Sequence, residues 1–372
     1  MAAAVLEQGE DAFRKMFRFY RRRNPPADLS GVLAFRAGEP RLRPVELSVG
    51  AVSDRDAGRL GLQPLRCWSA YHVDGYPGFL FIVNPFLPGW QHGWVRQCLK
   101  LYPRKPNVCN LDLHMSLEGD LWSHSHAQLR KKWSQRRSEK TLLEKLRWVT
   151  LGFHYNWDTK KYYREHHSPF PADLAALSRC VSLACGFHGF EAEAGILNYY
   201  HMDSSLGIHV DESELDHGSP LLSFSFGQSS IFLLGGVSRE VAPTPMMMHS
   251  GDIMVMSGAS RLLYHAVPRI LRHPGGGVLP PCLSVPPSSD DSSPLIEPCS
   301  PSDWEACESY LQSARINMTV RRVLAEGGNF PEEGDAQGAE VAHRDSYHNE
   351  EDELPEAEEP GLPERTRTAA QD

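Results

Sequence analysis

Short apolar stretches between residues 147 and 325 constrain the fold more than any other feature of the chain. They are separated by segments rich in Gly, Pro, Ser and Asn, and they lie at 148–153, 195–200, 221–226, 230–234, 252–257 and 315–323. Many short strands joined by such turns are typical of a β-sandwich or β-barrel. We therefore predict a chain of the α+β class whose centre is a β-sandwich or β-barrel.

The flanking regions have other compositions. Residues 10–23 predict a helix with aromatic residues on one face and basic residues on the other. Residues 275–303 are rich in Pro, Ser, Gly and Asp and predict a long surface insertion. We divide the chain into an N-terminal extension with helices and a basic, aromatic segment (1–146), a core (147–325) and a disordered acidic tail (326–372).

Charge is distributed unevenly along the chain. The tail from Glu326 onward holds fifteen acidic and three basic residues, a net charge of −12. Because the whole chain carries −9, the preceding residues carry −9 + 12 = +3, which is compatible with a nucleic-acid partner. No apolar run reaches the roughly 20 residues of a membrane span. Eight cysteines without a CxxC pair argue against a structural zinc site and favour a cytosolic, nuclear or mitochondrial compartment over secretion.

A His-x-Asp pattern suggests a metal site, because residues i and i+2 of a strand point the same way. The pattern occurs four times, at His72-Asp74, His201-Asp203, His209-Asp211 and His343-Asp345. His209 and Asp211 lie in the strand-rich region just after 206–208, a tight entry into a short strand, and His265 is the best candidate for a third ligand. Two histidines and a carboxylate suit Fe(II). A single histidine is more often an ordinary hydrogen-bonded residue, so this interpretation needs support.

The segment 315–321 provides a second polar pattern, Arg-Ile-Asn-Met-Thr-Val-Arg. Alternation along a strand places Arg315, Asn317, Thr319 and Arg321 on one face. That face either meets solvent or encloses an anion. Arginine binds carboxylates through paired, charge-assisted hydrogen bonds, so a small dicarboxylic acid is a suitable ligand.

Basic residues and tryptophan are interleaved between 67 and 148. One run of basic residues, 130–137, includes Arg130, Lys131, Arg136 and Arg137. Such a run is usually the solvated face of a helix, but it also suits contact with phosphates beside stacked bases. The sequence leaves both interpretations open.

The motifs together resemble the AlkB family of iron and 2-oxoglutarate dioxygenases. Asn198-Tyr199-Tyr200 resembles the family's Asn-x-Tyr, and 222–228 and 231–236 look like its central strands. His265-Ala-Val-Pro-Arg269 resembles its distal histidine motif, and 315–321 its Arg-x-Asn-x-Thr-x-Arg signature. The resemblance covers about 147–325, and the motifs agree with the family in order and spacing.

The resemblance implies a double-stranded β-helix, or jelly roll, that uses Fe(II), 2-oxoglutarate and O2. It implies that His209, Asp211 and His265 bind the iron. The residues implied to bind 2-oxoglutarate are Asn198, Tyr199, Tyr200, Arg315, Asn317, Thr319 and Arg321. We expect Arg315 to take the distal carboxylate. The implied reaction is oxidative demethylation that releases succinate, CO2 and formaldehyde.

The resemblance also implies a nucleic-acid substrate, such as N1-methyladenine in structured transfer RNA or N6-methyladenine in single-stranded or unpaired DNA. A base inside a protein pocket must be unpaired or flipped. Candidate base contacts are Trp122, Ser123, His124, Phe153, His154 and Tyr155, with the 130–137 run on the phosphates. The alternatives are an oxygenase acting on protein side chains, including histones, and a non-catalytic nucleic-acid-binding β-helix. We expect a nuclear and mitochondrial location, with a cytoplasmic pool as a further option.

Overall fold

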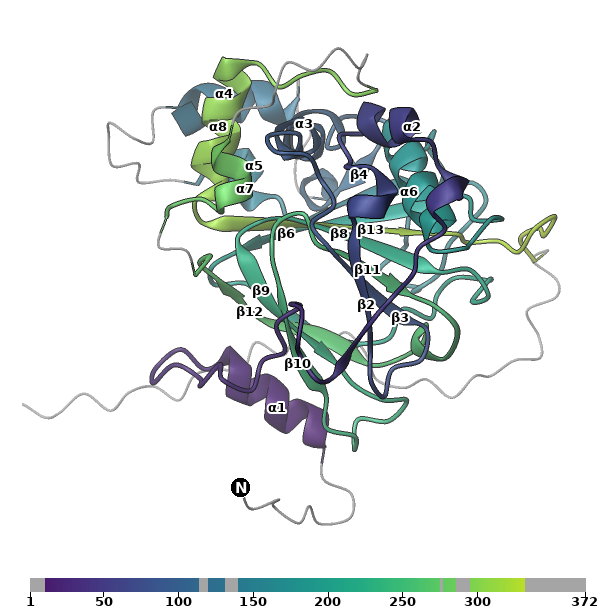
Figure 1. The fold of residues 1–372 in the computed structure, drawn as a ribbon. Helices are drawn as coiled ribbons and strands as arrows, with labels where there is room; N and C mark the ends of the chain where they lie inside the picture. The colour runs from purple at the N-terminus through teal and green to yellow at the C-terminus, as the bar shows by residue number, and fades with distance from the viewer. Residues whose placement is uncertain (1–10, 114–119, 131–139, 275–276, 286–294, 332–372) are drawn as a thin grey trace, which may run out of the picture.

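The computed structural model describes residues 11–113, 120–130, 140–274, 277–285 and 295–331. They form two antiparallel sheets, with helices above the larger sheet and one helix below the smaller one (Figure 1). The nine-stranded sheet has the order β1-β2-β3-β11-β8-β13-β6-β5-β4 and the four-stranded sheet the order β10-β9-β12-β7. The strands of the larger sheet are β1 (Leu42–Pro44), β2 (Ser69–Val73), β3 (Phe79–Val83), β4 (Val108–Cys109), β5 (Trp148–Gly152), β6 (Ala194–His201), β8 (Leu221–Gly227), β11 (Ile253–Met256) and β13 (Ala314–Arg321). Those of the smaller sheet are β7 (Leu206–His209), β9 (Ser229–Leu234), β10 (Thr244–Met248) and β12 (His265–Leu271).

Strands β6 to β13 form a jelly-roll core. Along the chain they alternate between the two sheets, except where β9 and β10 form a hairpin within the smaller sheet. Apolar side chains from both sheets fill the space between them, including Phe81, Phe232 and Met254. The six apolar stretches predicted from the sequence correspond to β5, β6, β8, β9, β11 and β13, which confirms the predicted strand-rich core.

Residues before 147 extend the same sheet. Strand β3 pairs with β11, β2 pairs with β3, and β4 pairs with β5 at the opposite edge. No break in the sheet therefore falls at residue 147, the expected start of the core. Strand β3 cannot be recognised in the sequence from an alternation of polar and apolar residues. Four of its five residues are buried, so it lacks the polar face that marks a half-exposed strand.

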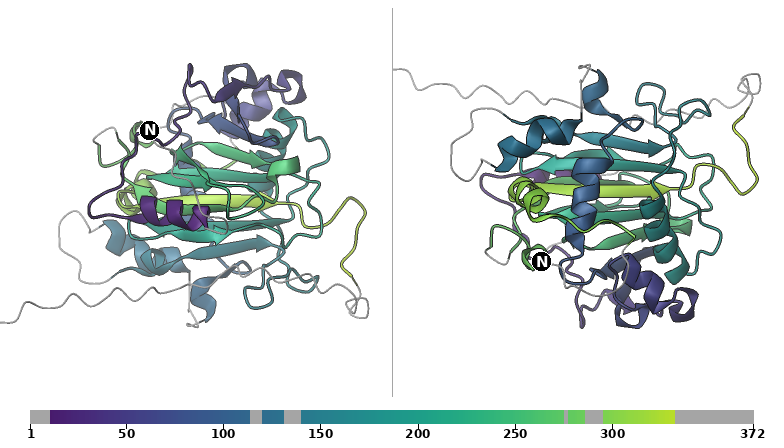
Figure 2. Two further views of the ribbon diagram at one scale, coloured as in Figure 1. Left: turned by 90° about the horizontal axis from the view of Figure 1, so that it is seen from below. Right: turned by 90° about the horizontal axis from the view of Figure 1, so that it is seen from above.

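Helix α1 (Ala12–Arg21) covers the outer face of the smaller sheet (Figure 2). Asp11 caps its first turn by accepting a hydrogen bond from the backbone N–H of Arg14. Phe13, Phe17 and Tyr20 are buried against β9 and β12. The exposed side of the helix carries Lys15, Arg18 and Arg21. The two faces predicted for this helix are thus confirmed.

The other helices lie on the outer face of the larger sheet, as the view from above shows (Figure 2). They are α2 (Asp54–Arg59), α3 (Gln91–Arg96), α4 (Leu121–Arg130), α5 (Leu142–Lys145), α6 (Ala172–Ala184), α7 (Pro281–Ser284) and α8 (Pro301–Leu311). A large apolar cluster joins these helices to the sheet, and it includes Ile316 and Met318 of β13. One face of β13 therefore packs against the helices, and the alternate residues of the strand point toward the space between the sheets.

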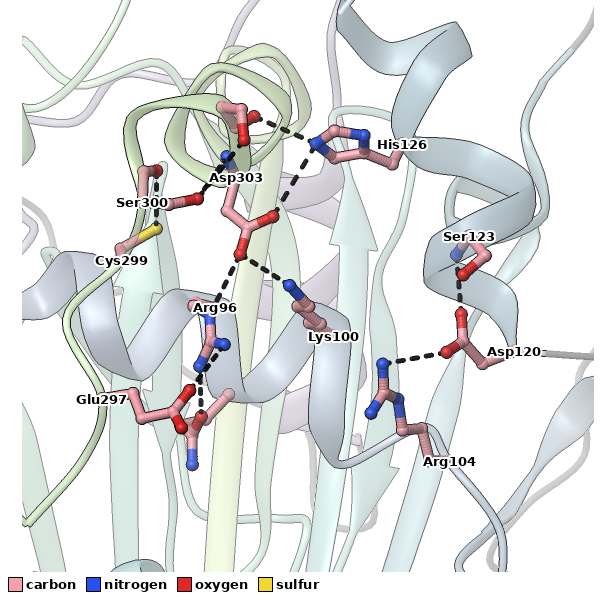
Figure 3. A network of polar contacts seen from close by, with 12 residues as sticks. Arg96, Lys100, Arg104, Asp120, Ser123, His126, Glu297, Cys299, Ser300 and Asp303 are labelled. Carbon is pink, nitrogen blue, oxygen red and sulfur yellow. Dashed lines mark hydrogen bonds and ion pairs between the residues drawn. The ribbon is translucent and has the colours of Figure 1, made fainter.

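A buried ionic network joins α3, α4 and α8 (Figure 3). Asp303 of α8 accepts hydrogen bonds from Arg96 Nε at 3.1 Å and Lys100 Nζ at 2.7 Å, and His126 Nε2 lies 3.8 Å from it. The surface insertion predicted over 275–303 is therefore wrong in part, because 301–303 form the first turn of a packed helix and because Leu279, Leu283 and Ile296 are buried in the apolar cluster. Of this range, 275–276 and 286–294 lie outside the described residues.

Helices of the described ranges lack the length and apolar character of a membrane span. All eight cysteines are free. The acidic tail expected over 326–372 lies outside the described residues from 332 onward.

Candidate metal and cosubstrate site

His209, Asp211 and His265 converge at one end of the jelly roll. His209 is the last residue of β7, His265 is the first of β12, and the two are directly paired across these strands. One ligand atom from each of the three side chains lies within 4.8 Å of the others. His265 Nε2 lies 3.6 Å from Asp211 Oδ2. The other His-x-Asp pairs in the described residues, at 72–74 and 201–203, form no such cluster.

Backbone carbonyls orient both imidazoles. Nδ1 of His209 lies 2.9 Å from the Gly207 carbonyl oxygen, and Nδ1 of His265 lies 3.0 Å from that of Leu263. A metal-binding imidazole typically donates its second ring N–H to such a carbonyl, which fixes the orientation of the ring. Burial, aided by the nearby His265, lowers the pKa of His209 to about 4. His209 is therefore neutral at pH 7, as a metal ligand must be.

The carboxylate is held in its ionised form. Burial by itself raises the pKa of Asp211, but Arg321 and the hydrogen bond with His265 outweigh it and hold the pKa well below its usual range. Two imidazoles and one carboxylate on one side of a cavity match the facial triad of non-haem Fe(II) oxygenases. The donor set thus fits Fe(II).

A buried guanidinium with unused donors lies in the same cavity. Arg315 is 2% exposed and donates from NH2 to Ser225 Oγ at 2.9 Å, while its Nε and NH1 have no hydrogen-bond partner among the described residues. The guanidinium lies 5.4 Å from the ring centre of Tyr200. Unsatisfied buried donors are costly, so this group requires a ligand. A carboxylate fits, since it accepts two parallel N–H bonds.

Strand β13 turns its polar face into this cavity. Asn198, Tyr200, Arg315, Asn317, Thr319 and Arg321 all line it. Asn317 donates to Ser223 Oγ at 2.8 Å, and Thr319 donates to Asn317 Oδ1 at 3.0 Å. All four polar residues of β13 are buried. The solvent-facing alternative is thereby excluded, and the alternation predicted for 315–321 is confirmed.

Arg321 differs from Arg315 because its charge is already matched. Its NH2 lies 3.3 Å from Asp211 Oδ2, and its Nε lies 3.2 Å from Glu214 Oε1. Two carboxylates thus share this guanidinium. Of the two arginines, Arg315 has more donors left for a bound anion. Its Nε and NH1 are unpaired among the described residues, whereas in Arg321 only Nε is, and that atom faces Glu214.

Tyr199 lies outside the site, which corrects the expected cosubstrate contact. Its hydroxyl donates to the Cys98 carbonyl oxygen at 2.6 Å, and its ring is buried in the cluster beneath the helices. Neighbouring residues of a strand point to opposite faces, so Asn198 and Tyr200 in the cavity require Tyr199 to point away.

Aromatic side chains also line the cavity. Of the predicted base contacts only Tyr155 is among them, together with Trp157 and Tyr162, which the sequence did not single out. Phe153 instead packs on His167 and Phe330, and His154 Nδ1 lies 2.9 Å from Thr150 Oγ1.

The base contacts predicted on α4 are wrong. Trp122 is buried in the helical layer on the opposite face of the larger sheet, and Ser123 and His124 are exposed on that same helix. Arg130 pairs with Glu305 of α8 at 2.7 Å. The remaining predicted phosphate contacts, Lys131, Arg136 and Arg137, lie outside the described residues.

Comparison with known proteins agrees with this geometry. The family model of the 2OG-Fe(II) oxygenase superfamily matches residues 78–321. The chain is 60% identical over 344 residues to the Mus musculus protein "Nucleic acid dioxygenase ALKBH1", covering 89% of this chain and 88% of that protein. It is 43% identical over 182 residues to "tRNA demethylase abh1" of Schizosaccharomyces pombe, covering 48% and 53%. It is 28% identical over 278 residues to "DNA N(6)-methyladenine demethylase ALKBH1A" of Arabidopsis thaliana, covering 68% and 77%. The chain therefore belongs to the 2OG-Fe(II) oxygenase superfamily, whose members use Fe(II), 2-oxoglutarate and O2, and within it to the AlkB family that its motifs resemble.

Proposed function

We propose that this chain is an iron(II)- and 2-oxoglutarate-dependent dioxygenase that removes methyl groups from nucleic-acid bases. The observation that carries the proposal is the placement of the His209, Asp211 and His265 cluster in one cavity with the unmatched guanidinium edge of Arg315. A dicarboxylate bound to Arg315 has its other end free to reach toward the metal cluster.

The protein residues have separate tasks in this scheme. His209, Asp211 and His265 bind Fe(II), which supplies the oxidising chemistry when bound. Arg315 binds the distal carboxylate of 2-oxoglutarate, and Asn198, Tyr200, Asn317 and Thr319 line the space around it. Arg321 stabilises the ionised form of Asp211. Buried surroundings strengthen each of these polar contacts.

The reaction balances as an oxidative demethylation. One oxygen atom of O2 enters succinate as 2-oxoglutarate loses CO2, and the other is inserted into a C–H bond of the N-methyl group. The C–N bond of the hydroxymethyl group then breaks and formaldehyde leaves. The hydroxyl proton passes to the nitrogen of an N6-methyl group, or to solvent when the methylated ring nitrogen was cationic, as in N1-methyladenine.

The aromatic part of the cavity suits a planar base. Tyr155 packs edge-on against Trp157 at 4.8 Å and against Tyr162 at 5.4 Å, so the three rings form one continuous wall. Aromatic rings stack on bases of any sequence. The base must first leave its helix, which favours unpaired positions in structured RNA such as transfer RNA and in single-stranded DNA. The names of the fission yeast and plant relatives point to these same two substrate classes.

The basic face of α1 favours nucleic acid over a histone substrate. Lys15, Arg18 and Arg21 are exposed on the helix that packs behind β7 and β12, the strands that carry His209 and His265. Such a surface attracts phosphates and repels a basic histone tail. The alternative is oxidation of histones, which an assay of product release with methylated nucleic acid and with a methylated histone peptide distinguishes.

Binding and catalysis can be separated with Asp211→Ala. We expect this variant to retain salt-sensitive binding to folded RNA and to lose 2-oxoglutarate turnover. Loss of both activities in a folded variant would contradict the assignment of Asp211 to the metal. Unchanged turnover would overturn the dioxygenase assignment of this cavity and favour the non-catalytic alternative.

The proposal includes a nuclear and mitochondrial location, with a cytoplasmic pool. These compartments contain the candidate nucleic acids, and their reducing conditions suit eight free cysteines. Fractionation of cells that express the tagged chain tests this part, and recovery from the secreted fraction alone would contradict it.

A further inference from the structure

We propose that Arg261 and Glu214 are positioning residues that hold the segments bearing Asp211 and His265 at a fixed separation. The inference rests on the metal-binding role proposed above. It concerns how this chain builds the site rather than which residues bind the metal.

Asp211 is the one member of the cluster outside regular structure. Strand β7 ends at His209, and 210–219 form no helix or strand. The position of the Asp211 carboxylate therefore depends on side-chain anchors. Arg261 supplies one: its NH1 donates to the Asp211 carbonyl oxygen at 2.6 Å, and its NH2 donates to Glu214 Oε2 at 2.8 Å. One planar guanidinium thus fixes both ends of 211–214.

Arg261 also belongs to the segment that carries the third cluster residue. It directly follows a 3-10 helix (Gly258–Ser260) and lies four residues before His265. The backbone on either side of it is anchored, since Arg261 N donates to the Gly258 carbonyl and Tyr264 N to that of Gly236. Its contacts with Asp211 and Glu214 therefore tie the two segments together.

Glu214 completes the connection from the other side. Its Oε1 accepts a hydrogen bond from the Tyr162 hydroxyl at 3.2 Å and lies 3.2 Å from Arg321 Nε. The side chains of Glu214 and Arg261 are each 2% exposed. By holding Arg321, Glu214 limits how strongly that guanidinium can pair with the Asp211 carboxylate. Without Glu214, Arg321 would compete with the metal for Asp211.

A purely structural ion pair provides the matched control. Arg96 and Asp303 form a buried pair in the helical layer, with side chains 9% and 8% exposed (Figure 3). This pair does not line the cavity. Arg96→Met and Arg261→Met each leave a buried carboxylate short of a partner, so both should destabilise the fold. Only Arg261→Met should disturb the metal cluster.

The test is a titration of the metal-free full chain with Mn(II), with thermal unfolding of the same samples. Partners that orient metal ligands typically change metal affinity by about 10–100-fold. We expect Arg261→Met and Glu214→Gln to raise the Kd for Mn(II) by a factor in that range, and Arg96→Met to leave it unchanged. Arg261→Lys should not restore affinity, because one ammonium cannot reproduce the two-pronged contact. Co(II) absorption should report altered ligand geometry in the Arg261 and Glu214 variants only.

Folded Arg261→Met protein with the Mn(II) affinity of the unaltered chain would overturn the inference. Equal weakening in Arg261→Met and Arg96→Met would also overturn it, because the effect would then follow overall stability. Asp211→Ala distinguishes this failure from failure of the proposed metal site. If the unaltered chain binds Mn(II) no better than Asp211→Ala does, the metal assignment itself is wrong.

Discussion

Replacing Arg315 with glutamine should weaken 2-oxoglutarate binding and leave metal binding intact. Arg315 is buried, uses NH2 to hold Ser225, and keeps Nε and NH1 for a ligand. Among the described residues its guanidinium contacts Ser225 and Tyr200 rather than the metal cluster. Glutamine has a similar apolar stem but lacks the charge and the paired donors.

The magnitude follows from the two hydrogen bonds that Arg315 can offer a carboxylate. A hydrogen bond to a charged group contributes about 1.5–3 kcal/mol, so two contribute about 3–6 kcal/mol. Glutamine can still donate one weaker bond, so we take the lower end, about 3 kcal/mol. Because every 1.4 kcal/mol changes an affinity tenfold, the Kd for 2-oxoglutarate should rise by roughly 100-fold.

Calorimetric titration of Mn(II)-loaded protein with 2-oxoglutarate measures this change. Arg322→Gln is the matched control, since Arg322 is also buried but donates to the backbone carbonyls of Leu324 and Gly189. Its Kd for 2-oxoglutarate should be unaltered. A change of less than about threefold in Arg315→Gln, which corresponds to under about 0.7 kcal/mol, would refute the assignment.

Further predictions concern stability, pH and nucleic-acid binding. Tyr199→Phe loses the hydrogen bond to the Cys98 carbonyl and should lower the free energy of unfolding by about 1 kcal/mol. The KM for 2-oxoglutarate should be unchanged, and a large rise in KM would mean that Tyr199 contacts the cosubstrate. Burial raises the pKa of Asp252 to about 7. The folded chain therefore keeps a proton that the unfolded chain releases above about pH 4, and the free energy of unfolding falls as pH rises from about 4 to about 7. In urea unfolding, Asp252→Asn should therefore gain stability relative to the unaltered chain between pH 5 and pH 7, and a constant difference would contradict the raised pKa. The double variant Arg18→Gln, Arg21→Gln should bind RNA more weakly in anisotropy titrations. The slope of log K against log salt concentration should become shallower by about 1–2, and the KM for 2-oxoglutarate should not change. An unchanged slope would show that α1 does not contact phosphates.

Local periodicity explains what the sequence could predict. The alternation of 315–321 places one set of side chains in the apolar cluster and the other set in the cavity, because a strand has only two faces. The motifs also identify His209 and His265 as candidate ligands, and the structure pairs these two residues across β7 and β12. The same alternation rule, applied to Asn198 and Tyr200, would have excluded Tyr199 from the cavity.

Long-range packing explains what the sequence could not predict. Trp122 was a reasonable candidate by residue type, but which face of the sheet its helix covers depends on contacts with α8 that no local pattern encodes. Glu214 and Arg261 are 47 residues apart, and their importance follows only from their direct contact. Tyr162 shares this property, because its place in the cavity depends on the path of an irregular segment.

The most direct test of the central claim is product release by the Fe(II)-loaded full chain supplied with 2-oxoglutarate and O2. Succinate and formaldehyde are measured with methylated transfer RNA, methylated single-stranded DNA and a methylated histone peptide. We predict equal amounts of both products with nucleic acid, none with the peptide, and loss of both in His265→Ala. Products formed only with peptide, or formed undiminished by His265→Ala, would contradict the proposed function.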